Sequence, residues 1–296
     1  MSKKQEVLVD TSSKKTAKIV ATNINRVYNI KNKIDGTTTE FQAIKQLDLT
    51  VNKGEFLAIV GPSGCGKSTF LDMIAGLAKP SSGEIFIDGK LITGPALDRG
   101  IVLQGYALFP WRTIRKNVEF GLEVKKVPKK DREVISQKFL DLVGLQTFED
   151  RYPHELSGGM KQRVAIARAL AYDPEVLLMD EPFAAVDAQT RESLQEELLR
   201  IWEKTKKTIV FVTHGIDEAV FLADRVAVMS TNPGSIKEII EINLPRPRND
   251  SIRSSAEFGW YRHKIWELLQ TDSALEEKKQ LPDQDIANSI SASAEL

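Results

Sequence analysis

The stretch Phe56-Leu-Ala-Ile-Val60-Gly61-Pro-Ser-Gly-Cys-Gly66-Lys67-Ser68-Thr69 decides the fold of this chain. It opens with an apolar run, Phe56 to Val60, of the kind that forms a strand buried on both faces. A helix-like run from Thr69 to Leu77 follows it. Between the two lies a complete G-x-x-x-x-G-K-[ST] loop, whose backbone N–H groups and following helix N-terminus can hold a phosphate chain. The segment therefore predicts a strand–loop–helix unit that binds the phosphates of a nucleotide.

The residues of this loop have distinct expected tasks. Its glycines let the backbone curl so that N–H groups face the β-phosphate. Lys67 is placed to reach the β- and γ-phosphates, and Ser68 is placed to ligate Mg²⁺. An ordinary loop rich in glycine and serine is the alternative, which the strand before it and the helix after it disfavour. The candidate nucleotide-binding residues of the loop are Gly61, Pro62, Ser63, Gly64, Cys65, Gly66, Lys67, Ser68 and Thr69.

The composition is that of a globular protein with no charge preference. Of the 296 residues, 42% are apolar and 28% are charged. The 41 basic residues balance 41 acidic ones, so no net field attracts nucleic acid or an anionic membrane surface. The single cysteine excludes an internal disulfide and agrees with a reducing compartment. Because Met1–Lys18 lacks the apolar segment of a secretory signal and no apolar run approaches ~18 residues, we expect a soluble protein that stays where it is made.

Strand-like stretches recur along the chain and alternate with helical patterns. Val176–Met179 and Ile209–Val212 are continuously apolar, as in a parallel sheet covered on both faces. Between Asn117 and Leu170 the strand signal disappears and the pattern becomes helical. We therefore predict an α/β fold: a P-loop NTPase core with a mostly parallel sheet, an N-terminal antiparallel β subdomain and an inserted helical subdomain. The predicted strands are Ile19–Val27, Leu47–Val51, Phe56–Val60, Glu84–Ile87, Gly100–Leu103, Val176–Met179, Thr208–Val212 and Arg225–Met229, with a polar hairpin loop at Asn32–Thr39.

The predicted domain organisation has four parts. Residues 1–16 are expected to be a flexible arm, and 17–235 an ATPase domain whose helical subdomain spans approximately 105–172. Residues 236–270 form a C-terminal extension, in which one apolar helix face is predicted by the spacing of Phe258, Tyr261, Ile265 and Leu268. The polar segment 271–296 is expected to be a disordered tail.

Two consecutive carboxylates, Asp180 and Glu181, end the apolar strand that begins at Val176. This position lies at the C-terminal edge of the predicted sheet, where parallel α/β folds place their ligands. Asp180 would hold Mg²⁺ through its water shell, and Glu181 would polarise an attacking water. A strand that merely ends in an acidic turn is the alternative, which the phosphate loop in the same chain disfavours.

A second candidate anion site precedes the helix-like run that starts near Met160. Ser157, Gly158 and Gly159 combine a hydroxyl, unshielded amides and a helix N-terminus. A simple N-cap is the alternative, and it is a frequent arrangement. Two half-sites for one phosphate chain suggest a nucleotide held between two subunits.

These segments together resemble the nucleotide-binding subunit of an ATP-binding cassette (ABC) transporter. The similarity extends from about residue 20 to 235, and the motifs occur in the order found in that family. The matches are the Walker A loop Gly61–Thr69, the Q-loop residue Gln104, the signature motif Leu156–Gln162, the Walker B strand Val176–Glu181, the D-loop Ala185-Val186-Asp187 and the switch histidine His214.

The resemblance implies the arrangement and the mechanism of the site. Two copies would pair head to tail, with ATP between the Walker A loop of one and Ser157 to Gly159 of the other. Glu181 would be the general base, and His214 would bridge the γ-phosphate and that carboxylate. Gln104 would sense Mg²⁺ and the water and pass the nucleotide state to the helical subdomain. The implied catalytic residues are Lys67, Gln104, Glu181 and His214, the implied metal residues are Ser68, Gln104 and Asp180, and the cofactors are ATP and Mg²⁺.

Two positions depart from the family pattern. The D-loop carries Val186 where leucine is usual, a small loss of volume that we expect to be tolerated. The aromatic residue that stacks on adenine should follow the first strand, where Tyr28 is the preferred candidate and Phe41 the alternative, since stacking tolerates either ring.

Short motifs point to one subfamily. The segments Asp98–Trp111 and Leu244-Pro-Arg-Pro-Arg248 resemble the ATPases of the nitrate, sulfonate and taurine importers. The chain would then energise uptake of such a solute through a separate permease, as a bacterial importer subunit. Phe109, Pro110 and Trp111 would help to line the groove that receives the permease, although packing of the helical subdomain explains them equally well.

The expected partners follow from this interpretation. They are a second copy of the chain, integral-membrane permease subunits at the cytoplasmic face of the membrane and, indirectly, an extracytoplasmic solute-binding protein, without nucleic acid. The alternatives are an ABC ATPase for another solute, an exporter with a separate permease, and a cytosolic ABC ATPase of DNA repair or translation. The absence of a long coiled-coil insertion, of a second cassette and of a basic stripe disfavours the last class.

Overall fold

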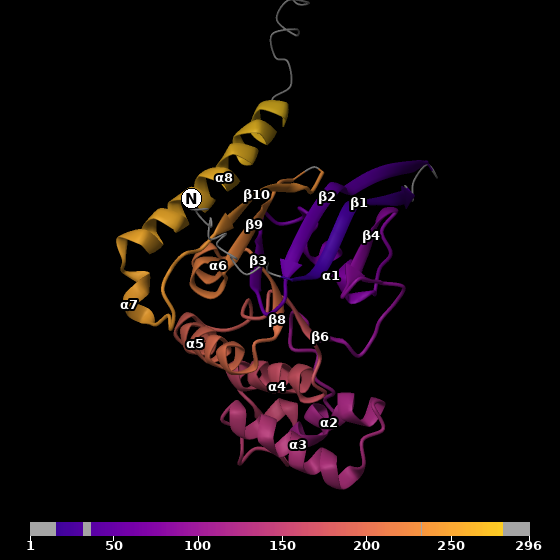
Figure 1. Cartoon of the computed structure of the whole chain (residues 1–296), viewed down its shortest axis with the longest axis vertical. Coiled ribbons are helices and arrows are strands. Elements are labelled where there is room, and N and C mark those ends of the chain that lie inside the picture. The colour runs from indigo at the N-terminus through magenta and orange to yellow at the C-terminus, as the bar shows by residue number, and fades with distance from the viewer. Residues whose placement is uncertain (1–15, 32–36, 232, 281–296) are drawn as a thin grey trace, which may run out of the picture.

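The structure is a computed structural model that describes residues 16–31, 37–231 and 233–280, with side chains up to residue 270. Within these residues a six-stranded sheet crosses the centre of the molecule in the order β10-β9-β3-β8-β7-β6 (Figure 1). Neighbouring strands pair in parallel, except that β10 pairs antiparallel with β9. The strands are β3 (Phe56–Val60), β6 (Arg99–Val102), β7 (Val176–Asp180), β8 (Thr208–Thr213), β9 (Arg225–Met229) and β10 (Ile236–Glu241).

A second, antiparallel sheet packs against one face of the first. Its order is β2-β1-β4-β5, and helix α1 (Lys67–Ala75) lies between the two sheets with Phe70 and Ile74 fully buried. Buried Lys18 links this layer to the other sheet, because its ammonium pairs with both Asp88 and Glu175. The strands are β1 (Ala17–Lys31), β2 (Thr38–Asn52), β4 (Ser82–Ile87) and β5 (Lys90–Leu91).

Helices cover the opposite face of the central sheet. Figure 1 shows α2 and α3 below α4, at the end of the molecule away from the antiparallel sheet. This helical insertion, the mostly parallel sheet and the antiparallel sheet confirm the predicted fold class. The helices are α2 (Ile114–Val124), α3 (Lys129–Leu142), α4 (Gly158–Ala171), α5 (Ala188–Thr205), α6 (Ile216–Leu222), α7 (Asp250–Arg253) and α8 (Ala256–Gln280), with a 3-10 turn at Pro153–Glu155.

The C-terminal extension is part of the packed structure. Helix α8 buries Phe258 and Ile265 and partly buries Tyr261 and Leu268, so the predicted apolar face packs against the core. Two features differ from the sequence-based expectations. Strand β10 belongs to the central sheet although it is not among the predicted strands, and α8 continues to Gln280, into the segment expected to be a tail. The expected arm lies outside the described residues except for its last residue, as do most of the hairpin loop and the rest of the tail.

The Leu244–Arg248 motif ties this extension to the core. Arg246 pairs with Asp224 at 2.8 Å and lies over the ring of Trp202. Arg248 is 5% exposed, and burial lowers the pKa of its guanidinium to about 10, so it stays charged at neutral pH. Its N–H groups donate to carbonyls at the end of α6 and after β10, namely those of Val220, Phe221, Ala223, Ile242 and Leu244. The motif therefore satisfies backbone acceptors that the helix itself leaves unpaired.

No helix within the described part of the chain is long and apolar enough to span a membrane.

We predict that Ile265→Ala lowers the free energy of unfolding by about 2–4 kcal/mol, because the residue is fully buried between α8 and the core and its loss leaves a cavity. Urea denaturation followed by circular dichroism measures this change. Trp260→Ala, on the exposed side of the same helix, is the control and should change stability by less than about 0.5 kcal/mol. Equal stabilities of the Ile265 variant and the wild type would contradict the packing of α8 on the core.

Candidate nucleotide site

The candidate site lies at the C-terminal ends of adjacent parallel strands. In the sheet order β3-β8-β7-β6, the phosphate loop follows β3, His214 follows β8, Asp180 ends β7 and Gln104 lies just beyond β6. The register aligns these ends, since Val60 pairs with Thr213 and Asp180 pairs with Val212. Parallel pairing therefore brings together side chains that are far apart in the sequence.

The phosphate loop joins β3 to α1, as the motif predicts. Gly66 has φ 98° and precedes the first residue of α1 without a side-chain cap, so the N-terminal amides of the helix stay available to a ligand. Lys67 is 5% exposed, and its ammonium donates to the carbonyls of Gly61 at 2.7 Å and Pro62 at 2.9 Å. The lysine thus lies against the loop, and its ammonium can exchange these carbonyls for phosphate oxygens.

Gly234, which is not among the sequence-predicted site residues, supports this loop from the turn after β9. Its N–H donates to the carbonyl of Ala43 at 3.0 Å, and its carbonyl accepts from Lys45. A Cβ at this position would lie 2.0 Å from the carbonyl oxygen of Cys65, so only glycine fits. Residues 43–45 of β2 and the turn after β9 therefore hold the loop from one side. A lone glycine after a strand gives no sequence signal for this contact.

Ser68 and Asp180 form the polar centre of the site. The Ser68 hydroxyl donates to Asp180 Oδ1 at 3.0 Å. Burial raises the pKa of the Asp180 carboxyl above its ordinary value, and the charges of Glu181 and Asp72 raise it further. Asp72 itself has a pKa raised by burial. The site thus gathers carboxylates that a cation would stabilise, among them Asp72, which is not one of the sequence-predicted site residues.

The two oxygen donors fit Mg²⁺. This ion favours one or two protein oxygens together with phosphate oxygens and water, rather than a cage built only from side chains. The hydroxyl of Ser68 and the carboxylate of Asp180 are hard oxygen ligands beside the phosphate loop. The predicted third member, Gln104, is exposed at the end of β6.

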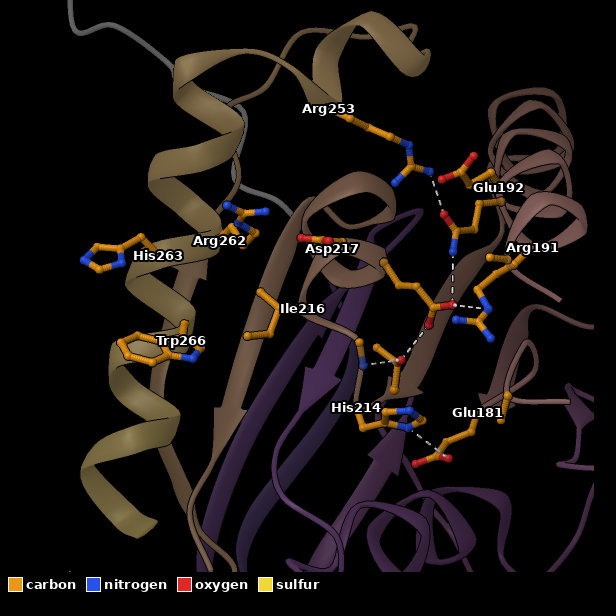
Figure 2. A pocket seen from close by; sticks show the side chains of 16 residues that line it. Glu181, Arg191, Glu192, His214, Ile216, Asp217, Arg253, Arg262, His263 and Trp266 are labelled. Carbon is orange, nitrogen blue, oxygen red and sulfur yellow. Dashed lines mark hydrogen bonds and ion pairs between the residues drawn. The ribbon is translucent and has the colours of Figure 1, made fainter. Parts of the chain in front are cut away.

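Glu181 and His214 form a second pair next to this centre. Figure 2 shows His214 pointing toward Glu181, and its Nδ1 lies 3.3 Å from Glu181 Oε2. Glu181 has φ 42°, a left-handed conformation that is uncommon for this residue type and often occurs at functional sites. Its backbone N–H donates to the carbonyl of Val212, which fixes the turn to the end of β8. The imidazole nitrogen therefore lies within hydrogen-bond distance of the carboxylate and can orient it.

The segment after Gln104 joins the site to the helical insertion. Tyr106 and Ala107 both have positive φ, and their carbonyls accept hydrogen bonds from the guanidinium of Arg168 at 3.0 and 2.6 Å. The Tyr106 hydroxyl donates to the carbonyl of Ala185 at 3.3 Å. One tyrosine thus links the predicted Q-loop to the predicted D-loop, and Arg168 links it to α4. Neither residue is among the sequence-predicted site residues.

Ser157 and Asp187 both cap helices in this structure. The Ser157 hydroxyl accepts from the N–H of Met160 at 3.3 Å at the start of α4, and Asp187 accepts from the N–H of Thr190 at 3.0 Å at the start of α5. That backbone hydrogen bond lowers the pKa of the Asp187 carboxyl. The atoms nearest to a Cβ at Gly158 belong to Tyr106 and Ala185, and none belongs to the phosphate loop. Within one chain, Ser157, Gly158 and Gly159 are therefore not part of the phosphate-loop half-site.

The two aromatic candidates for adenine stacking are cross-strand partners. Tyr28 of β1 pairs directly with Phe41 of β2, so the two rings project from the same face of the hairpin. They are 37% and 42% exposed, and the guanidinium of Arg26 lies 4.4 Å from the centre of the Tyr28 ring. The carbonyl of Ala43, two residues beyond Phe41, lies beside Gly66, so β2 contacts the phosphate loop.

Comparison with known proteins gives concordant matches. The family model described as ABC transporter matches residues 44–184. An uncharacterized ABC transporter ATP-binding protein of Methanocaldococcus jannaschii is 55% identical over 82% of this chain and 92% of its own length. The nitrate import ATP-binding protein NrtD of Synechocystis is 48% identical over 84% and 94%. The aliphatic sulfonates import ATP-binding protein SsuB of Bacillus thuringiensis is 46% identical over 83% and 95%.

A solved structure of an ATP-binding cassette is also similar to this chain. The dimeric, post-hydrolysis structure of the ATP-binding cassette MJ0796, bound to ADP and Pi, aligns with a TM-score of 0.66 at 32% identity. The alignment covers 77% of this chain and all of that cassette.

We predict that Asp180→Asn raises the melting temperature of the nucleotide-free protein at neutral pH. The pKa of Asp180 is higher in the folded protein than the value of 3.8 expected in the unfolded chain, so its ionisation costs folding free energy at neutral pH. The cost is complete above the folded pKa and disappears as the pH falls toward 3.8. Thermal melts at a series of pH values should therefore show a gain that shrinks on acidification.

Asp187→Asn is the matched control for this measurement. Because the pKa of Asp187 is lowered rather than raised, its ionised form stabilises the folded protein, and this substitution should not raise the melting temperature. A lower melting temperature of the Asp180 variant at neutral pH would contradict the assigned cause of the shift.

Proposed function

This chain belongs to the ABC transporter ATP-binding proteins, and we propose that it is the ATP-hydrolysing subunit of an importer that takes up a small anionic solute of the nitrate, sulfonate or taurine class through a separate permease. The observation that carries the hydrolytic part is the meeting of the phosphate loop, the Ser68–Asp180 pair and the Glu181–His214 pair at one sheet edge. The solute class rests on the identity to relatives named for nitrate and sulfonate import.

The side chains divide the chemistry of hydrolysis among them. The amides at the start of α1 and the Lys67 ammonium bind the β- and γ-phosphates and stabilise negative charge as it develops. Glu181 takes a proton from the attacking water, and His214 holds that carboxylate and reaches the γ-phosphate. Ser68, Asp180 and Gln104 would hold Mg²⁺, which neutralises phosphate charge when bound. Positioning and electrostatic stabilisation therefore account for the catalysis that we propose.

The complete site needs a second copy of the chain. A head-to-tail pair related by two-fold symmetry places Ser157, Gly158 and Gly159 of each copy against the ATP held by the phosphate loop of the other. The start of α4 suits this task because its unpaired amides and dipole favour an anion. Asp187, at the start of α5, would lie at the same interface. The dimeric form of the related cassette supports this arrangement.

The base of the nucleotide lies, in this proposal, against the β1–β2 hairpin. Tyr28 is the preferred stacking partner and Phe41 the alternative, and their direct pairing lets both rings contribute.

The permease would dock beside the Q-loop, on the cytoplasmic face of the membrane. Trp111 is 73% exposed, and the neighbouring Phe109 ring packs on Phe120 of α2 at a centroid distance of 4.7 Å. Asn117 is fully buried and bonds the backbone at both Phe109 and Arg112, which holds this loop rigid. A rigid loop with an exposed tryptophan suits a protein partner. An extracytoplasmic solute-binding protein would act on the permease from the other side, and nucleic acid has no role.

The first test is growth. A strain that lacks this gene should fail to grow on nitrate as sole nitrogen source, or on taurine or an alkanesulfonate as sole sulfur source, because import stops without ATP hydrolysis. The wild-type gene should restore growth, and Glu181→Gln should not. Normal growth of the deletion strain on all these sources would overturn the solute class and favour another solute or an exporter.

Purified Glu181→Gln separates binding from hydrolysis. We expect it to bind ATP with unchanged affinity and to form a stable dimer, while kcat falls by at least about 100-fold, because only the base is lost. A nucleotide-binding titration, size-exclusion chromatography with ATP and a phosphate-release assay measure the three quantities. Near-normal turnover would exclude Glu181 as the base.

The docking surface gives an independent prediction. Trp111→Ala should preserve ATP binding and weaken co-purification with the permease, because the exposed ring supplies apolar area to the contact. Trp260→Ala, which removes a 57% exposed tryptophan from α8, is the control and should co-purify normally. Equal recovery of the permease with the wild type and both variants would mean that Trp111 serves only the packing of the helical insertion.

A further inference from the structure

We propose that Arg253 is a positioning residue for ATP hydrolysis, through which the C-terminal extension holds the His214 loop in its working conformation. This inference rests on the proposed roles of Glu181 and His214. It goes beyond them because it assigns a task to the extension, which lies outside the segment that carries the nucleotide motifs.

A cavity of about 770 Å³ places the extension next to the catalytic pair. Figure 2 shows that its walls come from the His214 loop and α6, from the start of α5, and from α7 and α8. Glu181 and His214 lie at one end, and Arg253 of α7 at the other. The proposed catalytic centre and the extension thus share one cavity.

A continuous chain of hydrogen bonds runs along this cavity from Arg253 to the turn that carries His214 (Figure 2). The Arg253 guanidinium donates to Gln195 Oε1 at 2.6 Å, and the Gln195 amide donates to Glu218 Oε1 at 3.0 Å. Glu218 Oε2 accepts from the Thr213 hydroxyl at 2.6 Å, and that hydroxyl accepts from the N–H of Gly215 at 2.9 Å. The chain therefore ends on both residues that flank His214.

Burial gives this chain its rigidity. Gln195 and Thr213 are each 2% exposed, and the side chain of Glu218 is 14% exposed. Hydrogen bonds are stronger in such surroundings, and a buried group that loses its partner is costly. Arg253 is itself fixed, because its guanidinium lies 3.7 Å from the centre of the Phe221 ring on α6. Arg253 therefore sets the amide orientation of Gln195, which holds Glu218 together with the Arg191 guanidinium at 3.9 Å.

The consequence for hydrolysis follows from the position of Thr213. Its hydroxyl fixes the turn between β8 and α6, and the imidazole of His214 projects from that turn toward Glu181. Loss of Arg253 leaves the Gln195 amide free to turn away from Glu218. Glu218 then keeps only the Arg191 guanidinium, at 3.9 Å, and the Thr213 hydroxyl, so the turn is held less firmly. The phosphate loop follows β3 and is held by other contacts, so ATP binding should be unaffected.

Steady-state ATPase kinetics of the full-length protein test the proposal. Arg253→Met should lower kcat by about fivefold to tenfold, the effect of one lost buried hydrogen bond, with KM for ATP unchanged within about twofold. Arg253→Lys keeps a donor and should recover part of kcat. Arg262→Met is the matched control, since Arg262 lines the same cavity from α8 but is not part of the chain of hydrogen bonds, and its kcat should equal that of the wild type.

The double variant Arg253→Met with Gln195→Met separates positioning from stability. It removes both partners, so no buried amide is left unsatisfied, and Glu218 keeps the Arg191 guanidinium and the Thr213 hydroxyl. Its melting temperature should therefore be at least that of Arg253→Met while kcat stays low. Recovery of kcat together with the melting temperature would reduce Arg253 to a structural residue and overturn the proposal. If Arg253→Met does not fold, the lysine and double variants give the same decision.

Two reference variants distinguish the possible failures. Glu181→Gln and His214→Ala should both lose turnover. If either retains it, the proposed site is wrong. If both lose it while Arg253→Met has a normal kcat, the site stands and this inference alone is overturned.

Discussion

Charge cannot be accommodated inside strands that are buried on both faces, and this constraint places the chemistry of the whole protein. Every residue of β3 and β8 is buried, as are all but the last of β7. Their charged and polar side chains are therefore displaced to the strand ends, and parallel pairing gathers those ends at one edge. The phosphate loop, the carboxylates of Asp180 and Glu181 and the imidazole of His214 meet at this edge because the buried interior of the sheet excludes charged groups.

The carboxylates at the same edge are destabilised in their ionised form. Asp72, Asp180 and Glu181 approach each other beside the buried loop, and burial raises the pKa of both aspartates. The ionised carboxylates are thus destabilised while no ligand is bound. Such an arrangement is typical of a site that binds a cation and a phosphate chain, and it lowers the stability of the folded protein. Lys67, held by backbone carbonyls instead of a carboxylate, stays available to the nucleotide.

The C-terminal extension is an integral part of this design. Strand β10 completes the sheet edge, Arg248 satisfies carbonyls at the end of α6, and Arg253 reaches α5. Helix α6 begins at Ile216, directly after Gly215, the residue that follows His214. The bonds from Arg248 and, through Gln195, from Arg253 therefore hold this helix near both of its ends. The extension therefore contacts the elements that carry the proposed hydrolytic centre. The nucleotide motifs alone include no such contact.

The sequence by itself determined the elements whose signal is local. The phosphate loop, the apolar strands, the carboxylates at Asp180 and the helix face at Ile265 depend on spacing within a few residues, and the structure contains each of them. Only the tertiary structure decided the long-range contacts. Gly234 against the phosphate loop, Tyr106 against Ala185, the Tyr28–Phe41 pair and the bonds from Arg253 to Thr213 depend on which segments pack together. A local pattern carries no record of such neighbours, because burial of the whole chain selects them.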